Sequence, residues 1–181
     1  REEKSALYLA VEKENEEIVK ELLNHKEIDV NCKYFRIDHS NSENEEKSIL
    51  QFAFEKGNEN IIKLLLSNPN INVNVKSRIK RKVDEKIEIE EQTTLSYAIN
   101  YGNVEILKLL LSNPELNINA KNLNLMNEFN SKKCLIEEKN LLEIANEKNP
   151  EIFQFLFEYL KDLYSKSGDK RLNRIISKFI K

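Results

Sequence analysis

The chain has 181 residues, of which 40% are hydrophobic and 33% charged, and its formal net charge is −2. This balance is typical of a soluble globular domain with a buried core. The small net charge excludes a strong overall attraction to nucleic acid or to anionic membranes. No apolar run approaches the roughly 18 residues that a membrane-spanning helix needs, so we expect no membrane span.

Two cysteines, Cys32 and Cys134, are too few for a disulfide framework. They indicate a reducing compartment, so we expect a cytoplasmic location, with the nucleus as the alternative. No signal-like segment opens the chain. Because the chain begins with Arg1 rather than Met, we expect a fragment of a longer protein that is monomeric by itself.

One sequence unit occurs four times along the chain, and each copy consists of a short helix, a tight turn, a second helix and an extended exit. The second and third copies are the most alike: both contain the run KLLLSNP, and both place a glycine, Gly57 or Gly102, between the helices. Repetition at this scale predicts a solenoid in which each repeat contacts only its neighbours. The copies occupy residues 5–31, 48–74, 93–119 and 140–164.

Apolar residues recur at helical spacing within each unit. In the third copy, Leu95, Ala98 and Ile99 form one stripe of the first helix. The second helix, which includes Leu109, is apolar on nearly every side, so it must be packed between its neighbours. Glycine ends the first helix, where a left-handed residue is least strained, and Asn-Pro ends the second. The first copy has Glu14 in place of the glycine, so this end unit is irregular.

The units resemble ankyrin repeats. The family pattern T-P-L-H-x-A is matched in part by the runs SALYLA, SILQFA, TTLSYA and NLLEIA, and the family exit D-V-N by DVN, NVN and NIN. The Pro and His are missing from every copy, so the hydrogen bonds that this His makes between repeats in the family are not expected here. The repeats are also longer than the family's, which have about 33 residues. Their equivalent residues Leu7, Leu50, Leu95 and Leu142 lie 43, 45 and 47 residues apart.

The resemblance implies an all-α repeat solenoid of stacked helix–turn–helix units, with long β-hairpin or loop fingers and a C-terminal capping helix. Residues 1–181 would form a single domain. The extra length lies in three inserts at the place of the family's β-hairpin fingers. These inserts are residues 32–47, 75–92 and 120–139.

The middle insert alternates in polarity on both sides of Asp84, as a β-hairpin does. Folding it about Asp84 pairs Ile79 with Ile89 on one face and Arg78 with Glu90 on the other. One register therefore satisfies the apolar and the charged pairs together.

The other two inserts differ in character. The first begins with an aromatic and apolar cluster and continues with Asn, Ser and Glu, which predicts a mobile tip. The third alternates at Leu123 and Leu125 and again around Cys134 and Ile136. This pattern predicts a second long hairpin that turns near residues 127–131.

After the fourth unit, a long aromatic helix is broken at Gly168, and Asp169 caps a last helix over residues 169–181. Its apolar residues lie at helical spacing, with basic residues opposite. We expect a cap that has one face on the stack and one in water. A basic amphipathic helix that lies on an anionic membrane or a partner is the alternative.

Motifs for catalysis or cofactor binding are lacking in the sequence. His25 and His39 have no ligand spacing to either cysteine, and the glycines form no phosphate-binding loop. Cys32 has no positioned base among the repeats. We therefore expect a protein that is not an enzyme and binds no cofactor and no metal.

Ankyrin-like stacks bind proteins with their finger tips and the exposed ends of their first helices, so the resemblance implies a non-catalytic protein-binding module. Tyr101 is an attractive anchor, because large amphipathic side chains are common at interfaces, but packing against the neighbouring finger explains it equally well. Packing between fingers is likewise the alternative for the finger aromatics. The candidate partner-binding residues are Glu12, Lys13, Glu55, Lys56, Asn100, Tyr101, Glu147 and Lys148 on the helices and Tyr34, Phe35, Arg78, Arg81 and Phe129 on the fingers.

A competing interpretation is nucleic-acid binding or nuclear targeting through the basic strand 76–82. The glutamates within 88–91 lie opposite this strand in the predicted hairpin and would neutralise it, so we expect a protein partner rather than nucleic acid. A third interpretation is the recognition arm of a larger multidomain protein. The positive residues of the strand are Lys76, Arg78, Lys80, Arg81 and Lys82.

Overall fold

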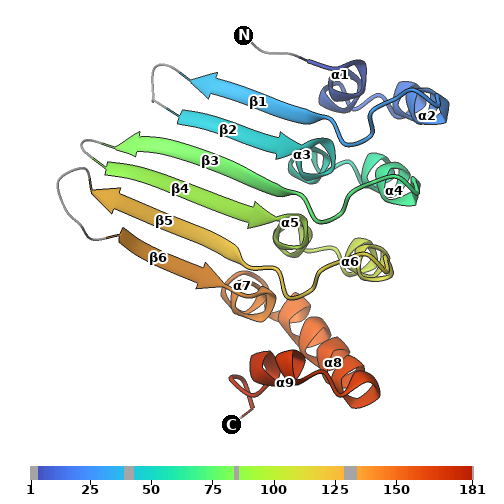
Figure 1. Cartoon of the computed structure of the whole chain (residues 1–181). Helices are drawn as coiled ribbons and strands as arrows, with labels where there is room; N and C mark the ends of the chain where they lie inside the picture. The colour runs from blue at the N-terminus through green and yellow to red at the C-terminus, as the bar shows by residue number, and fades with distance from the viewer. Residues whose placement is uncertain (1–3, 39–42, 84–85, 129–133, 181) are drawn as a thin grey trace.

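The computed structural model describes residues 4–38, 43–83, 86–128 and 134–180. The helices in it pair as α1 (Ala6–Glu12) with α2 (Glu16–Asn24), α3 (Ile49–Lys56) with α4 (Glu59–Ser67), α5 (Thr94–Tyr101) with α6 (Val104–Leu111), and α7 (Leu141–Lys148) with α8 (Pro150–Ser167). In Figure 1 the first helices form a row next to a β-sheet, and the second helices lie on the side of this row that is away from the sheet. The stacked helix–turn–helix units predicted from the sequence are therefore present.

Polar side chains fix the beginning of each of these helices. Ser5, Ser48, Thr93 and Asn140 cap the first helices by accepting a hydrogen bond from the backbone of the first turn. An asparagine does the same for every second helix. The caps satisfy backbone N–H groups that have no partner within the helix.

The turn between the paired helices contains a left-handed residue in the first three repeats, whereas Asn149 between α7 and α8 is extended. Gly57 and Gly102 have φ angles of 78° and 77° and end α3 and α5, as predicted. Glu14 takes the equivalent position after α1 with φ of 53°. A residue that carries a Cβ atom is strained in this conformation, so the first repeat contains a strained turn.

We expect Glu14→Gly to raise the free energy of unfolding by about 1 kcal/mol, because glycine adopts this backbone without strain. Gly57→Ala is the reverse change, and its added Cβ atom would have an ordinary contact of 3.8 Å with Tyr101. Its loss, also about 1 kcal/mol, therefore reports on the backbone alone. Urea unfolding followed by circular dichroism measures both. An unchanged midpoint for Glu14→Gly would contradict strain at this turn.

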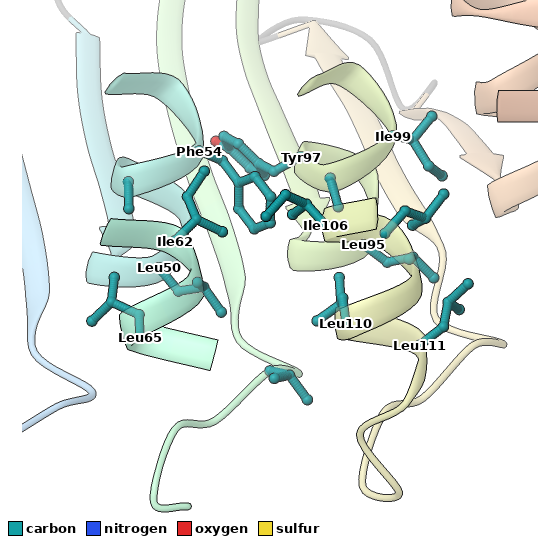
Figure 2. Close-up of a cluster of buried hydrophobic side chains, with 14 of the residues drawn as sticks. Leu50, Phe54, Ile62, Leu65, Leu95, Tyr97, Ile99, Ile106, Leu110 and Leu111 are labelled. Atoms are coloured by element: carbon teal, nitrogen blue, oxygen red, sulfur yellow. The ribbon is translucent and has the colours of Figure 1, made fainter. Parts of the chain in front are cut away.

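The hydrophobic core is a strip between the stacked helices (Figure 2). Ile62 and Leu65 of α4 and Ile106 and Leu110 of α6 are fully buried in it. Leu109 corrects the expectation that the second helix of the third repeat is covered on every side, because 38% of this residue is exposed. A helix packed between two neighbours still has a side that faces away from the stack.

The three inserts form hairpins that pair with one another. The strands are β1 (Lys33–Asp38), β2 (Glu43–Ser48), β3 (Lys76–Val83), β4 (Lys86–Thr93), β5 (Asn122–Glu128) and β6 (Cys134–Lys139). Because β2 pairs with β3 and β4 with β5, the described residues contain one antiparallel sheet that is continuous from β1 to β6. The sequence predicts separate fingers and does not predict this pairing between them.

The register of the middle hairpin differs by one residue from the predicted one. Ile79 pairs with Glu90 and not with Ile89. The prediction folds the insert about Asp84, whereas in the structure Val83 pairs with Lys86, which shifts every pair along the hairpin by one residue. Because side chains alternate along a strand, this shift places Ile79 and Ile89 on opposite faces of the sheet.

The other two fingers are hairpins as well. β2 covers the polar run 43–48, where the sequence predicts no strand. Its backbone pairs with β1 on one side and β3 on the other, which satisfies its polar groups without an apolar pattern. The expected mobile tip falls on residues 39–42, outside the described residues. β5 and β6 confirm the third hairpin, whose connection at 129–133 also lies outside them.

Gln51 replaces the His that is missing from the family pattern in the second repeat. This fully buried side chain donates hydrogen bonds to the carbonyl groups of Val75 at 2.8 Å and Gln92 at 3.3 Å, the first and last residues of the middle insert. Ser96, at the corresponding position of the third repeat, instead donates to the carbonyl of Thr93 in its own repeat. Gln51 therefore makes hydrogen bonds of the kind that the family's His makes between repeats.

Asparagines in the exit turns connect successive repeats, and we call them the asparagine ladder. The amide of Asn31 donates to the carbonyl of Asn70 at 2.8 Å and accepts from the N–H of Asn72 at 2.7 Å. Asn74 makes the same two bonds to the next exit turn, at 2.6 and 2.8 Å. Asn119 is the third member, and its buried side-chain oxygen accepts no hydrogen bond from the part of the chain that the structure describes.

We expect Asn74→Ala to lower the free energy of unfolding by about 1 kcal/mol, because the change breaks two hydrogen bonds between repeats. Asn119→Ala is the matched change at the position without these bonds, and we expect less than about 0.5 kcal/mol. Urea titration of both variants gives the comparison. Equal losses at the two positions would mean that the ladder contributes nothing to stability.

The C-terminal segment packs on the last repeat. α8 ends at the left-handed Gly168, and Asp169 caps α9 (Lys170–Ile176), as predicted. α9 is shorter than the predicted helix over 169–181, but Leu172 and Ile176 are buried, as their spacing predicts. Phe179 lies beyond the helix and packs edge to face on Phe153 of α8, with ring centroids 5.4 Å apart. The apolar side of this segment is therefore used within the fold.

Candidate functional site

A hollow lies where the C-terminal ends of the first helices meet the sheet. One part, of about 400 Å³, lies between α3 and α5, and a second, of about 230 Å³, continues it toward α7. The two parts share Gln92 and Asn100, and we call them together the central hollow. The other lining residues are Phe54, Glu55, Ile79, Tyr97 and Tyr101 in the first part and Glu90, Asn122, Asn124, Lys139, Ile144, Glu147 and Lys148 in the second.

Two tyrosines form much of one wall. Tyr97 is 7% exposed and donates a hydrogen bond to Ser77 Oγ at 3.2 Å, and burial raises the pKa of its hydroxyl. Tyr101 donates to the carbonyl of Gly57 at 3.0 Å and lies edge to face against Phe54, with centroids 6.0 Å apart. Tyr101 therefore packs against the preceding repeat while its side chain lines the hollow.

Lys47 is buried between two glutamates next to the first part of the hollow. Its Nζ lies 2.6 Å from Glu45 and 2.5 Å from Glu55. Burial alone would lower the pKa of Lys47, but the hydrogen bonds to Glu45 and Glu55 outweigh this effect and raise the pKa. Lys47 thus stays positive and fixes the candidate residue Glu55 at the rim.

We expect Lys47→Met to lower the free energy of unfolding by about 1.5–3 kcal/mol, because Glu45, only 9% exposed, loses its closest positive partner. Lys63→Met removes an exposed ion pair with Glu59 and serves as the control, with an expected loss below about 0.5 kcal/mol. Chemical unfolding at neutral pH measures both changes. Similar losses for the two variants would show that burial does not strengthen the Lys47 cluster.

We call the face of the sheet that carries Ile79 and contacts the first helices the inner face, and charged residues cross it in a row. Arg36 binds Glu43 at 2.7 Å, Glu43 binds Arg81 at 2.8 Å, and Arg81 binds Glu90 at 3.3 Å. Hydrogen bonds from Arg81 and Arg36 hold the pKa of Glu43 below its usual value. Arg81 therefore connects two fingers and is neutralised by its neighbours.

The opposite face, which we call the outer face, carries an exposed apolar pair. Phe35 and Ile37 are 47% and 49% exposed and line a groove of about 430 Å³ together with Arg78. Arg78, which the predicted register sets opposite Glu90, pairs with Glu91 and lies 2.8 Å from it. Strand alternation places three more cations of the basic strand on this face. They are Lys76, Lys80 and Lys82.

The structure brings some predicted candidates together and separates others. Tyr34 lies on the inner face and Phe35 on the outer face, because they are consecutive in β1. Lys13 is exposed at the end of α1. Phe129 lies outside the described residues. The candidates that line the central hollow are Glu55, Asn100, Tyr101, Glu147 and Lys148.

Three further candidates cluster around the first two repeats. Tyr34 stacks on Tyr8 with ring centroids 4.7 Å apart. Tyr8 donates a hydrogen bond to Glu12 at 3.2 Å, and Lys56 Nζ lies 5.7 Å from the centre of the Phe52 ring. A hydrogen bond from Lys4 is the main reason that the pKa of Glu12 is lowered. These residues hold the first finger to the helices.

Several residues of the hollow were not predicted as candidates. Gln92, Ile79 and Tyr97 line it, and the first two come from the strands of the middle finger. Alternation along the insert does indicate that Glu90 and Gln92 share a face. Only the correct register shows that this is the face toward the helices. The alternation of the sequence therefore groups these residues but does not place them in the hollow.

The chemistry of the remaining reactive groups is limited. Cys32 accepts a hydrogen bond from Ser5 at 3.2 Å, and burial raises the pKa of its thiol, which keeps it protonated and weakly nucleophilic. Among the described residues, no group of three or more potential ligands could hold a metal ion. None of the helices in the described ranges is long and apolar enough to cross a bilayer.

Stacked helix–turn–helix repeats with β-hairpin fingers define an ankyrin-type repeat protein. The family described as ankyrin repeats (3 copies) matches residues 1–77 and 40–122, which is more than half of the chain. The chain therefore belongs to the ankyrin-repeat family, whose members commonly serve as protein–protein interaction modules and are usually non-catalytic. No curated protein and no solved structure matches the chain.

Proposed function

We propose that the chain is a non-catalytic module that binds another protein in the central hollow and over the adjoining inner face. The observation that carries the proposal is the convergence of candidate residues from α3, α5 and α7 on this one hollow. A partner seated there would contact successive repeats at once. We also infer a single domain over residues 1–181 and a cytoplasmic or nuclear location.

The composition of the hollow supports a protein partner. Phe54, Ile79 and Tyr97 provide a largely buried apolar floor, while Asn100 and Lys148 are exposed at the edge. Protein interfaces have this arrangement, with an apolar centre and a polar rim. Aromatic residues such as Tyr97 and Tyr101 are also frequent among the residues that dominate binding energy.

Nucleic-acid binding on the outer face is the alternative function, because strand alternation gathers most cations of the basic strand there. Glu91 weakens this alternative, since it lies 3.5 Å from Lys76 and 2.8 Å from Arg78. Glu46 on the same face holds Lys33 at 2.6 Å. Phosphate contacts require cations that are not already neutralised, and they weaken steeply with added salt.

The test is affinity capture from a lysate of the source cells at low and high salt, with the chain and two variants as bait. Asn100→Arg places a bulky charge on the rim of the central hollow, at an exposed residue that lines both of its parts. Asn70→Arg is the matched control at an exposed exit turn outside the hollow. We expect a protein retained at high salt by the unchanged chain and by Asn70→Arg, and about tenfold weaker capture by Asn100→Arg.

Equal capture by the Asn100→Arg and Asn70→Arg baits would reject the central hollow as the binding surface. Nucleic acid that is captured by all three baits and released by salt would support the outer-face alternative. Removing Lys80 and Arg78 together, as glutamines, would then abolish that capture.

A further inference from the structure

A second pocket lies at the C-terminal end of the stack, between the exit turn of the third repeat and α9. Its volume is about 280 Å³, and it shares no lining residue with the central hollow. The pocket contains Asn119, the last member of the asparagine ladder. The buried side-chain oxygen of Asn119 has no donor among the described residues, although buried polar atoms are normally paired.

Asn119 has the same local conformation as the ladder members that are bonded. The N–H of Asn74 is held by the side chain of Asn72 at 2.9 Å, and the N–H of Asn119 by that of Asn117 at 3.1 Å. An equivalent bond of 2.9 Å orients Asn31. The backbone of Asn119 is therefore held by the same short turn as that of its bonded equivalents.

The equivalents show which partner such a side chain binds. Asn74 donates to the carbonyl of Glu115 and accepts from the N–H of Asn117, two residues further on. Asn31 binds the carbonyl of Asn70 and the N–H of the residue two further on in the same way. The ladder asparagine thus recognises the main chain of a short extended turn. An anion without a donor group could not satisfy the oxygen of Asn119.

The surroundings of Asn119 select the charge of such a segment. Lys121, Arg171, Arg174 and Lys178 line the pocket. Arg174 is exposed and has no ion pair within the described residues, while the other three hold Glu138, Asp169 and Glu143 of this chain. These pairs are largely exposed, and exposed pairs are weak enough to exchange with the carboxylates of a ligand.

We propose that the pocket between the third exit turn and α9 binds an acidic peptide segment of a partner protein. The amide of Asn119 bonds the carbonyl of one residue of the peptide and the N–H two residues further on, and Arg174 with its basic neighbours binds the flanking carboxylates. This second surface is separate from the central hollow. An experiment that rejects the peptide site therefore leaves the proposed function of the central hollow untouched, and the reverse also holds.

The probe is a fluorescein-labelled peptide, EENPELNINEE, in which acidic ends flank the chain's own exit-turn sequence of residues 113–119. Its neutral counterpart has glutamine at every glutamate. Fluorescence anisotropy at low salt measures binding to the full chain. We expect the acidic peptide to bind about tenfold more tightly than the neutral one and to weaken as salt is added.

Two variants test the two parts of the recognition. Asn119→Leu removes the amide that contacts the main chain, and we expect about tenfold weaker binding of the acidic peptide. Arg174→Gln removes a cation from the exposed side of α9, and we expect about fivefold weaker binding. Lys166→Gln removes a positive charge from α8 outside the pocket and is the control, for which we expect no change.

Since the side-chain amide of Asn119 is observable by NMR, a shift of its signal on adding the peptide would locate the contact in the unaltered protein. A peptide that binds without moving this signal would overturn the proposal. Equal weakening of peptide binding by Arg174→Gln and Lys166→Gln would overturn it too, because it would show that the peptide is attracted by the overall charge and not by the pocket. Competition by a single-stranded oligonucleotide as effective as the unlabelled peptide would replace the peptide with nucleic acid as the ligand.

Discussion

The stacking of the helices sets the geometry on which the rest of the structure depends. Each second helix buries its apolar side only against its neighbours, as the full burial of Ile61 and Ile106 shows. Packed helices lie about 8–10 Å apart. Two strands of a sheet together span about 9–10 Å. Because each insert supplies one two-stranded finger per repeat, successive fingers meet at the distance at which strands pair, and the continuous sheet follows from the stacking.

Pairing between fingers produces a surface with two chemically different faces. On the inner face, the chain of ion pairs from Arg36 through Glu43 to Arg81 ties the first finger to the middle one. On the outer face, Phe35 and Ile37 are left exposed. Residues that are adjacent in the sequence therefore lie on different faces. The basic strand 76–82 is divided in this way, because Arg81 lies on the inner face and its other cations on the outer face. The strand residues that line the central hollow all lie on the inner face.

The helices, their caps and their turns could be predicted because their signals are local. The sheet could not, because it depends on contacts between inserts more than 30 residues apart, and β2 has no apolar pattern of its own. The register failed for a different reason: Arg78 faces a glutamate in both registers, Glu90 in the predicted one and Glu91 in the structure. Charge pairing could not choose between them. Asn100 and Tyr101 of the candidate site follow from the resemblance, whereas Gln92 and Ile79 require the correct register.

The first and last repeats of the stack contain groups that lack the partners which their equivalents have in the interior repeats. Ile18 is 50% exposed, whereas the equivalent Ile61 is fully buried because a preceding repeat covers it. At the other end, the oxygen of Asn119 has no donor among the described residues, whereas that of Asn74 is bonded to the next exit turn. In a repeat protein, each unsatisfied group at an end has counterparts inside the same molecule whose partners are visible. The interior thus shows which partner each group has where a neighbouring repeat is present: a helix face for Ile61, and peptide main chain for Asn74.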